Sequence, residues 1–286
     1  MYNYTISIIL CIVIASISYG CEQTQKEKIR VKAKRVWKKP VRISYHLENT
    51  QSWLQRNSDK TQRSIVLAVN RTDSSHLAKM DSILVPDDLS GDLATYLPFP
   101  ASVPGVDKVE KIIFFSYPSQ TFAAYAYGEL FYAGPTNMGR KADPTPVGLY
   151  FTNWKAEKTT STFNDEWDLY WNFNIENKKG IGFHQYELPG YPASHSCLRL
   201  LETDAKFLYN WAEQWILKDD ETILAKGTPV IVFGSYPFDG AKPWVQLLSN
   251  PHALNITATS LQQTATPYLK TILKEQQTRA AVATNE

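Results

Sequence analysis

Cysteine is scarce in this sequence: only Cys11, Cys21 and Cys197 occur among 286 residues. So few cysteines exclude a disulfide-rich scaffold, and the first two lie in the N-terminal segment, far from the third. Cys197 therefore has no evident partner. An isolated cysteine is either a small side chain that packs like a hydrophobe or a reactive thiol, and its neighbours in the sequence must distinguish the two.

The sequence also lacks an apolar run of the ~20 residues that a membrane-spanning helix needs. The apolar stretch from Ile6 to Ile17 is shorter, ends in small residues and is followed by a polar, charged segment. This pattern is typical of a signal peptide, here residues 1–20, although no Lys or Arg precedes the apolar stretch. We therefore expect an exported protein, in which an unpaired thiol such as Cys197 is unusual.

The junction Gly20-Cys21 behind this segment resembles the lipobox of bacterial lipoproteins, except that Ser18 stands where a leucine is usual. The resemblance implies that Cys21 is lipidated and becomes the new amino terminus. The expected location is then the cell envelope, on the periplasmic side, as a membrane-anchored lipoprotein. The alternative is a plain signal peptide that is cleaved nearby, with Cys21 incidental.

Neither sign of charge dominates, because 30 Lys and Arg face 28 Asp and Glu. No global field therefore predicts a nucleic-acid partner. Nine basic residues lie between Lys26 and Arg42, with Glu27 as the single acid. We interpret residues 21–50 as a basic, solvated tether after the lipidated cysteine; attraction to anionic lipid or to wall carboxylates is the alternative.

Residues 51–105 predict a small N-terminal subdomain. A helix is expected from Trp53 to Val69, and a second apolar pattern leads into Ile83-Leu84-Val85-Pro86. This order of helix, polar turn and helix resembles a LysM-like wall-binding module, with a purely structural subdomain as the alternative. Proline and glycine in residues 98–105 indicate a linker.

Residues 106–234 predict the main domain, built mainly of β-strands with one or two helices. Short runs rich in aromatic and branched side chains are separated by turn residues, which favours a sandwich or barrel over alternating βα units. The expected strands are residues 111–116, 120–127, 129–133, 148–152, 169–174, 182–185 and 228–234. One helix is expected with Thr203 as N-cap and Asp204 in its first turn. Residues 235–286 predict an extension that is helical around 269–276 and disordered from about Thr278.

Two histidines and an arginine gather near the lone thiol, at His184, His195 and Arg199. A free thiol has a pKa of about 8.5, so nucleophilic work near neutral pH needs a neighbouring base or positive charge. If residues 194–197 are extended, His195 shares one strand with Cys197, whereas His184 comes from a separate strand and can face the sulfur. We predict His184 as general base and His195 as a secondary, orienting or electrostatic group. No Cys or His cluster has metal-ligand spacing, so neither a metal nor a cofactor is expected.

This region resembles the YkuD family of L,D-transpeptidases, whose signature is an upstream His, a loop, and then Ser-His-Gly-Cys followed by a small apolar residue and Arg or Asn. The matching residues are His184, Ser194-His195-Ser196-Cys197, Leu198 and Arg199, preceded by Gly139 and Thr145-Pro146-Val147-Gly148. Ser196 departs from the family's glycine, which would permit a positive φ more easily than serine does.

The resemblance implies a YkuD-like β-sandwich that acts on tetrapeptide stems of peptidoglycan through a cysteine acyl-enzyme and transfers the acyl group to an acceptor amine, forming cross-links or attaching acceptors. It implies Cys197 as nucleophile, backbone amides of Ser196 and Cys197 as the oxyanion hole, and the carbonyl of Gln185 as the group that orients His184. Arg199 and Ser194 would bind substrate, with a structural ion pair as the alternative for Arg199. The implied partners are stem peptides, and the membrane through the lipid anchor.

Two other functions remain open. A thiol-dependent peptidoglycan hydrolase or amidase would use the same thiolate with water as acceptor. A non-catalytic wall-binding lipoprotein would use neither, and Ser196 and the LysM-like segment motivate this alternative. A papain-like protease is disfavoured because its cysteine precedes its histidine in the chain.

Overall fold

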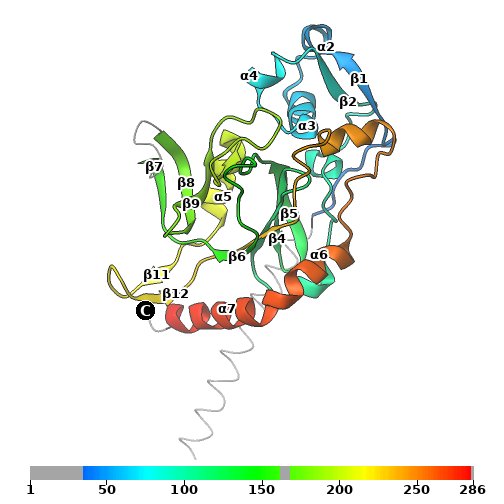
Figure 1. The fold of residues 1–286 in the computed structure, drawn as a ribbon. Coiled ribbons are helices and arrows are strands. Elements are labelled where there is room, and N and C mark those ends of the chain that lie inside the picture. Colours follow the sequence, from blue (N-terminus) through cyan, green and yellow to red (C-terminus); the bar gives the residue numbers. More distant parts are fainter. Residues whose placement is uncertain (1–34, 162–167, 285–286) are drawn as a thin grey trace, which may run out of the picture.

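A computed structural model describes residues 35–161 and 168–284 of the chain (Figure 1). The predicted signal peptide, Cys21 and the first part of the predicted tether lie outside the described residues. Within the described ranges no helix is long and apolar enough to cross a membrane.

The central unit consists of two β-sheets. The five-stranded sheet has the order β5-β4-β3-β13-β6, and the four-stranded sheet has the order β10-β9-β8-β7. The strands of the first sheet are β3 (Ile112–Ser116), β4 (Thr121–Ala126), β5 (Glu129–Pro135), β6 (Gly148–Phe151) and β13 (Pro229–Phe233). Those of the second are β7 (Lys155–Thr160), β8 (Asp168–Glu176), β9 (Ile181–Gln185) and β10 (Leu198–Leu200). A small pair, β11 (Ile216–Leu217) and β12 (Ile223–Ala225), is separate from both sheets.

One hydrophobic core fills the space between the two sheets. Phe115 and Phe122 of the larger sheet meet Phe173 and Phe183 of the smaller one, with ring centroids of Phe115 and Phe183 6.2 Å apart. Helix α5 (Glu202–Trp211) contributes Ala205, Leu208 and the adjacent Ala212 to the same cluster. The predicted mainly β sandwich is therefore confirmed.

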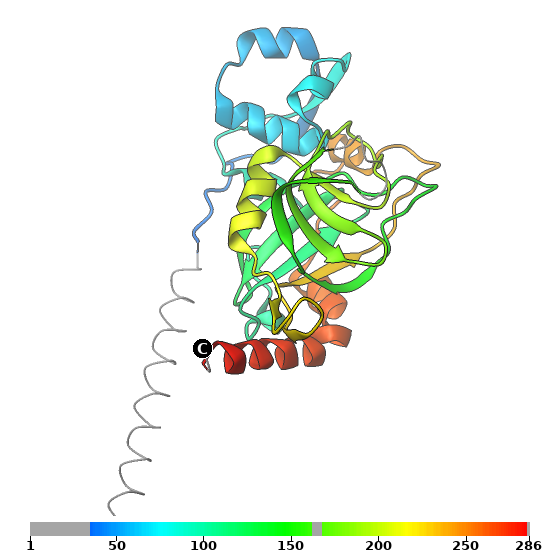
Figure 2. The same cartoon turned by 90° about the vertical axis from the view of Figure 1, so that its left-hand side faces the viewer.

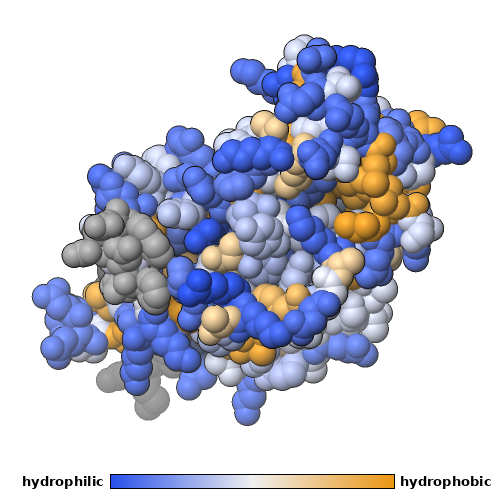
Figure 3. Space-filling model, turned by 45° about the horizontal axis from the view of Figure 1, so that its top comes forward, coloured by the Kyte–Doolittle hydropathy of each residue, from blue (hydrophilic) through white to orange (hydrophobic). Residues whose placement is uncertain are grey.

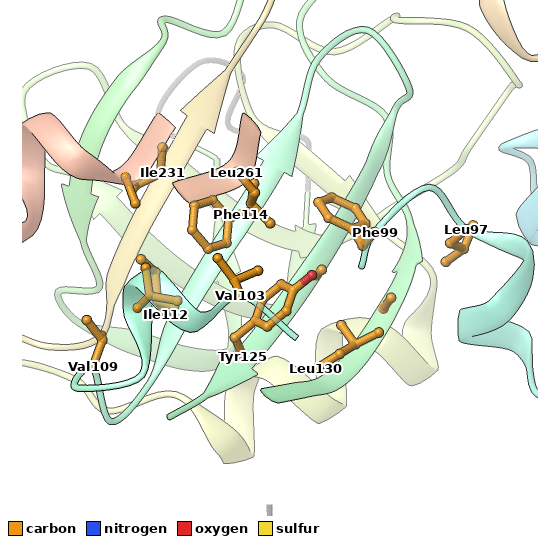
Figure 4. Packing of buried hydrophobic residues seen from close by; sticks show 14 of the residues in the cluster. Leu97, Phe99, Val103, Val109, Ile112, Phe114, Tyr125, Leu130, Ile231 and Leu261 are labelled. Atoms are coloured by element: carbon orange, nitrogen blue, oxygen red, sulfur yellow. The ribbon is translucent and has the colours of Figure 1, made fainter. Parts of the chain in front are cut away.

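The opposite face of the larger sheet is also covered. Phe114, Tyr125 and Ile231 pack with the linker and with the C-terminal helices α6 (Ala258–Ala265) and α7 (Leu269–Ala283) (Figure 4). Figures 1 and 2 show α7 running along one end of the molecule. Because both faces of the larger sheet are buried, its central strands are continuous apolar runs. They do not show the alternation of apolar and polar residues that is typical of a strand with one exposed face.

The N-terminal subdomain is a β-α-α-α-β unit. Strands β1 (Tyr45–Asn49) and β2 (Ser82–Pro86) pair antiparallel, with helices α2 (Thr50–Arg56), α3 (Lys60–Asn70) and α4 (Ser74–Leu77) between them in the chain. The expectation of one helix over residues 53–69 is wrong, because the helix is interrupted at residues 57–59. Asn57 closes α2, and Asp59 starts α3 by accepting a hydrogen bond from the Gln62 amide at 2.8 Å. The resemblance to LysM remains a prediction.

The described residues contain six α-helices, of which only α5 lies in the predicted main domain. The other five belong to the N-terminal subdomain and the C-terminal extension. Short 3-10 helices occur at η1 (Leu93–Tyr96), η2 (Pro104–Val106), η3 (Pro243–Leu248) and η4 (Thr266–Tyr268). Two helix boundaries differ from expectation: Leu201, not Thr203, occupies the N-cap of α5, and α7 continues past Thr278 to Ala283.

Most of the surface seen in Figure 3 is hydrophilic. The largest hydrophobic area on this face lies beside the N-terminal subdomain, where that subdomain meets the rest of the molecule.

Candidate active site

Strands β9 and β10 bring His184 and Cys197 to the same end of the smaller sheet. The two strands pair in parallel, and His184 lies opposite Arg199 in the register. Cys197 directly precedes β10, so residues 186–197 form the connection that returns the chain to the same edge of the sheet. The expectation that residues 194–197 are extended is wrong: this stretch is a loop, within which only Ser194 makes a bridge, to Gly139.

Ser196 adopts a left-handed backbone conformation, with φ of 76°. This conformation is easy for glycine and strained for other residues. The serine hydroxyl offsets part of the cost, because Oγ donates to the carbonyl oxygens of Asp143 and Pro144, each at 3.2 Å. The loop thus has the geometry that glycine favours although serine occupies the position.

Hydrogen bonds from the segment around Gly139 support the loop of residues 194–197, which we call the cysteine loop. The amide of Gly139 donates to Thr145 Oγ1 at 2.8 Å, and that hydroxyl donates to the carbonyl of Ser196 at 2.9 Å. A Cβ at residue 139 would lie 2.2 Å from the carbonyl oxygen of Asp143, so only glycine fits there. Ser194 Oγ donates to the carbonyl of Cys197 at 2.5 Å, so this side chain supports the loop.

A cavity of about 180 Å³ opens beside Cys197. It brings together most of the predicted site residues: Cys197, His184, His195, Ser194 and Arg199 all line it. Ser196 and Gln185 are not among the lining side chains. Gln185 instead acts through its backbone, because its carbonyl oxygen lies 3.0 Å from Nδ1 of His184.

This contact fixes the tautomer of His184. A carbonyl oxygen only accepts, so the proton sits on Nδ1 and leaves the Nε2 lone pair free to take a proton. Burial lowers the pKa of His184 to about 4; the Gln185 carbonyl opposes this shift and the charge of Arg199 adds to it. The imidazole is therefore neutral, and competent as a base, at all pH values above about 4.

The Cys197 thiol is free, and the residue is partly buried. Burial raises its pKa, and the Gly182 backbone and the positive charge of Arg199 compensate only in part. Sγ lies 3.7 Å from the carbonyl oxygen of Gly180 and can donate to it. The resting site thus contains a neutral thiol and a neutral imidazole rather than an ion pair, so proton transfer must accompany attack on a substrate.

His195 and Arg199 have different neighbours in the cavity. Nε2 of His195 lies 4.0 Å from Oδ2 of Asp143, and burial lowers the pKa of His195, with the charge of Arg140 adding to this shift. The guanidinium of Arg199 stacks over the Tyr186 ring, with Cζ 4.4 Å from the ring centroid. Arg199 makes no ion pair among the described residues, so the structural alternative for this side chain gains no support.

The sequence reasoning missed part of this cavity. Asn172 and Asn174 of β8, together with Trp154 and Lys179, also line it. The two asparagines are two residues apart on a strand, which places them on one face. This spacing could have indicated that both line the same cavity. Among the described residues no group of three His, Cys, Asp or Glu side chains could hold a metal ion.

The N-terminal subdomain contacts the loop that joins His184 to Cys197. Leu188 donates its amide to Oδ2 of Asp73 at 2.8 Å, and its carbonyl accepts from the Thr72 hydroxyl at 2.8 Å and from the Asp73 amide at 3.1 Å. No signal in the sequence linked these residues, because 115 positions separate Asp73 from Leu188.

Comparison with known proteins identifies the domain that carries this site. Residues 110–232 match the family model of YkuD, described as the L,D-transpeptidase catalytic domain. The matched segment covers less than half of the 286 residues and spans both sheets and α5. A search of curated proteins finds no significant match.

Solved L,D-transpeptidases are among the structures to which the chain is similar. One from Stackebrandtia nassauensis shares 25% identity, with a TM-score of 0.37, over 46% of this chain and 58% of that chain. One from Mycobacterium tuberculosis shares 23% identity, with a TM-score of 0.36, over 44% of this chain and 58% of that chain. One from Mycobacterium smegmatis shares 19% identity, with a TM-score of 0.36, over 44% and 59%. The match thus spans a little over half the length of each of these structures.

Proposed function

We propose that this protein is an L,D-transpeptidase that acts on peptidoglycan tetrapeptide stems through an acyl-enzyme on Cys197. The observation that carries the proposal is the cavity that the free thiol of Cys197, the neutral imidazole of His184 and the guanidinium of Arg199 all line. A nucleophile, a base and an anion-binding group are the parts that transfer of a peptide acyl group needs.

In the first half-reaction, His184 Nε2 takes the thiol proton as Sγ attacks the carbonyl carbon between diaminopimelate and the terminal D-Ala. Backbone amides of Ser196 and Cys197 stabilise the oxyanion. The C–N bond breaks, the imidazolium gives its proton to the leaving amine, and D-Ala departs, leaving a thioester on Cys197. In the second half-reaction, an acceptor amine attacks the thioester, His184 takes its proton and returns it to sulfur, and the new amide is released.

The remaining side chains of the cavity serve substrate binding in this proposal. Arg199 binds a stem carboxylate, and it also stabilises the thiolate as it forms, because its charge lowers the pKa of Cys197. His195 is a secondary group that adjusts the electrostatics of the cavity. Asn172 and Asn174 supply amide donors and acceptors for the stem backbone.

The proposal includes export and anchoring. The apolar segment from Ile6 to Ile17 and the junction at Cys21 support a lipoprotein on the periplasmic side of the envelope. Cells fed labelled palmitate should incorporate it into the wild-type chain and not into Cys21→Ala. Equal labelling of the two would contradict lipidation at this residue.

Product analysis tests the reaction itself. The purified full chain is incubated with disaccharide-tetrapeptide muropeptides, and products are followed by mass, with Cys197→Ala as control. We expect cross-linked dimers and free D-Ala from the wild-type chain and neither from the variant. Monomers shortened by D-Ala with water added would identify the hydrolase instead, and the absence of any turnover would favour the non-catalytic lipoprotein.

A further inference from the structure

A second, larger cavity lies away from Cys197, where the N-terminal subdomain, the proline-rich linker and the C-terminal extension meet. Its volume is about 420 Å³, within the range of small-molecule sites. Buried Tyr45, Arg71 and Leu130 line its inner part, and exposed Lys39, Ala101 and His252 line its outer part. The cavity therefore extends from solvent to the interior.

Arg71 is the unusual residue of this cavity. It occupies the C-cap of α3 with a left-handed φ of 57°, and its side chain is 1% exposed. Nε donates to the carbonyl of Ser119 at 2.7 Å, and Nη1 donates to the carbonyls of Ala68 and Val69 at 2.5 and 2.9 Å. These bonds cap the helix and join the subdomain to the catalytic domain, which accounts for two of the three guanidinium nitrogens.

The carbonyl bonds leave the charge of Arg71 without a counter-ion. Within the described residues Arg71 makes no ion pair, and no hydrogen bond engages its Nη2. None of the described residues that line the cavity is Asp or Glu. Burial lowers the pKa of Arg71 to about 10, which still leaves the guanidinium charged at neutral pH. A buried, unpaired charge is costly, so the interior of this cavity favours an anion.

The walls around Arg71 suit an apolar or aromatic ligand body. Leu97 and Phe99 present apolar side chains to the cavity, and the Trp244 ring, which does not line it, packs against the guanidinium at 5.6 Å.

We propose that this cavity binds a small organic carboxylate, with the carboxylate held by Arg71 and an apolar or aromatic body packed against the linker and the C-terminal extension. The site is separate from the Cys197 cavity and does not depend on the proposed reaction. A purely structural Arg71 explains the carbonyl bonds but explains neither the absence of Asp and Glu from the described lining residues nor the open cavity that Arg71 lines.

A matched pair of probes tests the charge requirement. Binding of 3-phenylpropionate and of its neutral amide, 3-phenylpropionamide, to the full chain is measured by isothermal titration calorimetry. We expect the acid to bind at least tenfold more tightly than the amide, because only the acid pairs with the guanidinium. Equal binding of the two, or affinity of the acid weaker than about 1 mM, would overturn the proposal.

Variants locate the binding. Leu254→Trp fills the cavity without altering Arg71, so it should abolish binding of the acid while the melting temperature stays near that of the wild type. Arg199→Gln changes the other cavity and should leave binding unchanged. If Leu254→Trp binds the acid as the wild type does, or if Arg199→Gln removes binding, the carboxylate site is not at Arg71.

Arg71→Gln is the direct variant, and it also removes bonds that support α3. If circular dichroism shows that this variant is folded, it should no longer bind the acid more tightly than the amide. A retained preference for the acid would overturn the proposal. Leu254→Trp decides the matter where Arg71→Gln does not fold.

Discussion

Ser196 shows how a single side chain sets the shape of the cysteine loop. Its φ of 76° is a conformation that costs a residue with a Cβ on the order of 1 kcal/mol or more. The hydroxyl has one proton, which it shares between the carbonyl oxygens of residues 143 and 144, so it returns about 1 kcal/mol. Hydrogen bonding therefore offsets part of the strain at this position.

A pair of substitutions separates the backbone from the hydroxyl. Ser196→Gly should change the free energy of unfolding by less than about 1 kcal/mol and keep most activity, because it removes both the strain and the bonds. Ser196→Val cannot reach a positive φ without severe strain and should lose most activity. Activity assays and urea unfolding measure both effects, and a fully active valine variant would show that the left-handed turn is not required.

Asp204 is a second residue whose environment predicts a measurable effect. Its side chain is buried, Oδ1 accepts from the Tyr132 hydroxyl at 2.7 Å, and Oδ2 has no hydrogen-bond partner among the described atoms. Burial raises its pKa from 3.8 to about 7, against hydrogen bonds from Tyr132 and Thr203. The folded state therefore binds this proton more tightly than the unfolded chain does.

The consequence is a loss of stability as pH rises from about 4 to about 7. The contribution of Asp204 is complete below pH 4 and falls by about 4 kcal/mol once the pH exceeds 7. Asp204→Asn keeps the acceptor for Tyr132 and cannot ionise. Urea unfolding at pH 5 and pH 8 should show that the free energy of unfolding of the variant increases relative to that of the wild type as pH rises. An unchanged difference between the two proteins would refute the raised pKa of Asp204.

At the scale of elements, the active site depends on a connection between distant segments. The turn between α3 and α4 holds Leu188 through three hydrogen bonds, two to its carbonyl and one from its amide. Leu188 lies in the connection between β9, which carries His184, and the loop that carries Cys197. The N-terminal subdomain thereby restrains the path between base and nucleophile.

Asp73→Ala removes the carboxylate that accepts from the Leu188 amide. Hydrogen bonds to a charged group contribute about 1.5–3 kcal/mol, so we expect a comparable loss of stability together with slower acylation of Cys197. Asp87→Ala is the matched control, because Asp87 lies in the same subdomain and binds only Ser44 and His46 at the surface. If both variants acylate at the same rate, the subdomain does not position the loop.

The strands of the main domain were largely predictable, because runs such as Ile112–Ser116 carry their own β-propensity. Strand β7 was not, since Lys155–Thr160 has Ala156 as its single apolar residue and is held by pairing with β8. The parallel pairing of β9 and β10 could not be predicted from the sequence either, because it depends on where the twelve-residue connection between them brings the chain back to the sheet. The two histidines and Arg199 were found because they are close in sequence to Cys197, the single cysteine among the described residues. Asp73 was missed because its contact is long-range.

At the scale of the whole molecule, the C-terminal extension is part of the core. Its average composition is polar, yet Leu261, Ala265 and Ile272 are buried against the outer face of the larger sheet. Gln276 also bonds the Glu110 amide at 2.8 Å, and Arg279 bonds the carbonyl of Gln214 at 2.8 Å. A few apolar residues on one face of a helix are enough to hold it in place when they pack against an apolar surface of the sheet.

Adjacent substitutions in α7 test this packing. Ile272→Asp places a charge in a buried apolar site and should lower stability by more than about 3 kcal/mol. Thr271→Asp introduces the same charge one residue away on the exposed side and should stay within about 1 kcal/mol of the wild type. Thermal unfolding of both variants decides whether α7 packs as described, since similar effects would contradict it.

The most direct measurement is the intact mass of the full chain after brief incubation with a tetrapeptide muropeptide and an acid quench. The wild type should gain the mass of the muropeptide less that of D-Ala, on a peptide that contains Cys197, and His184→Gln should acquire this adduct far more slowly. An adduct on any other residue, or release of D-Ala by Cys197→Ala at the wild-type rate, would contradict acyl transfer through this thiol.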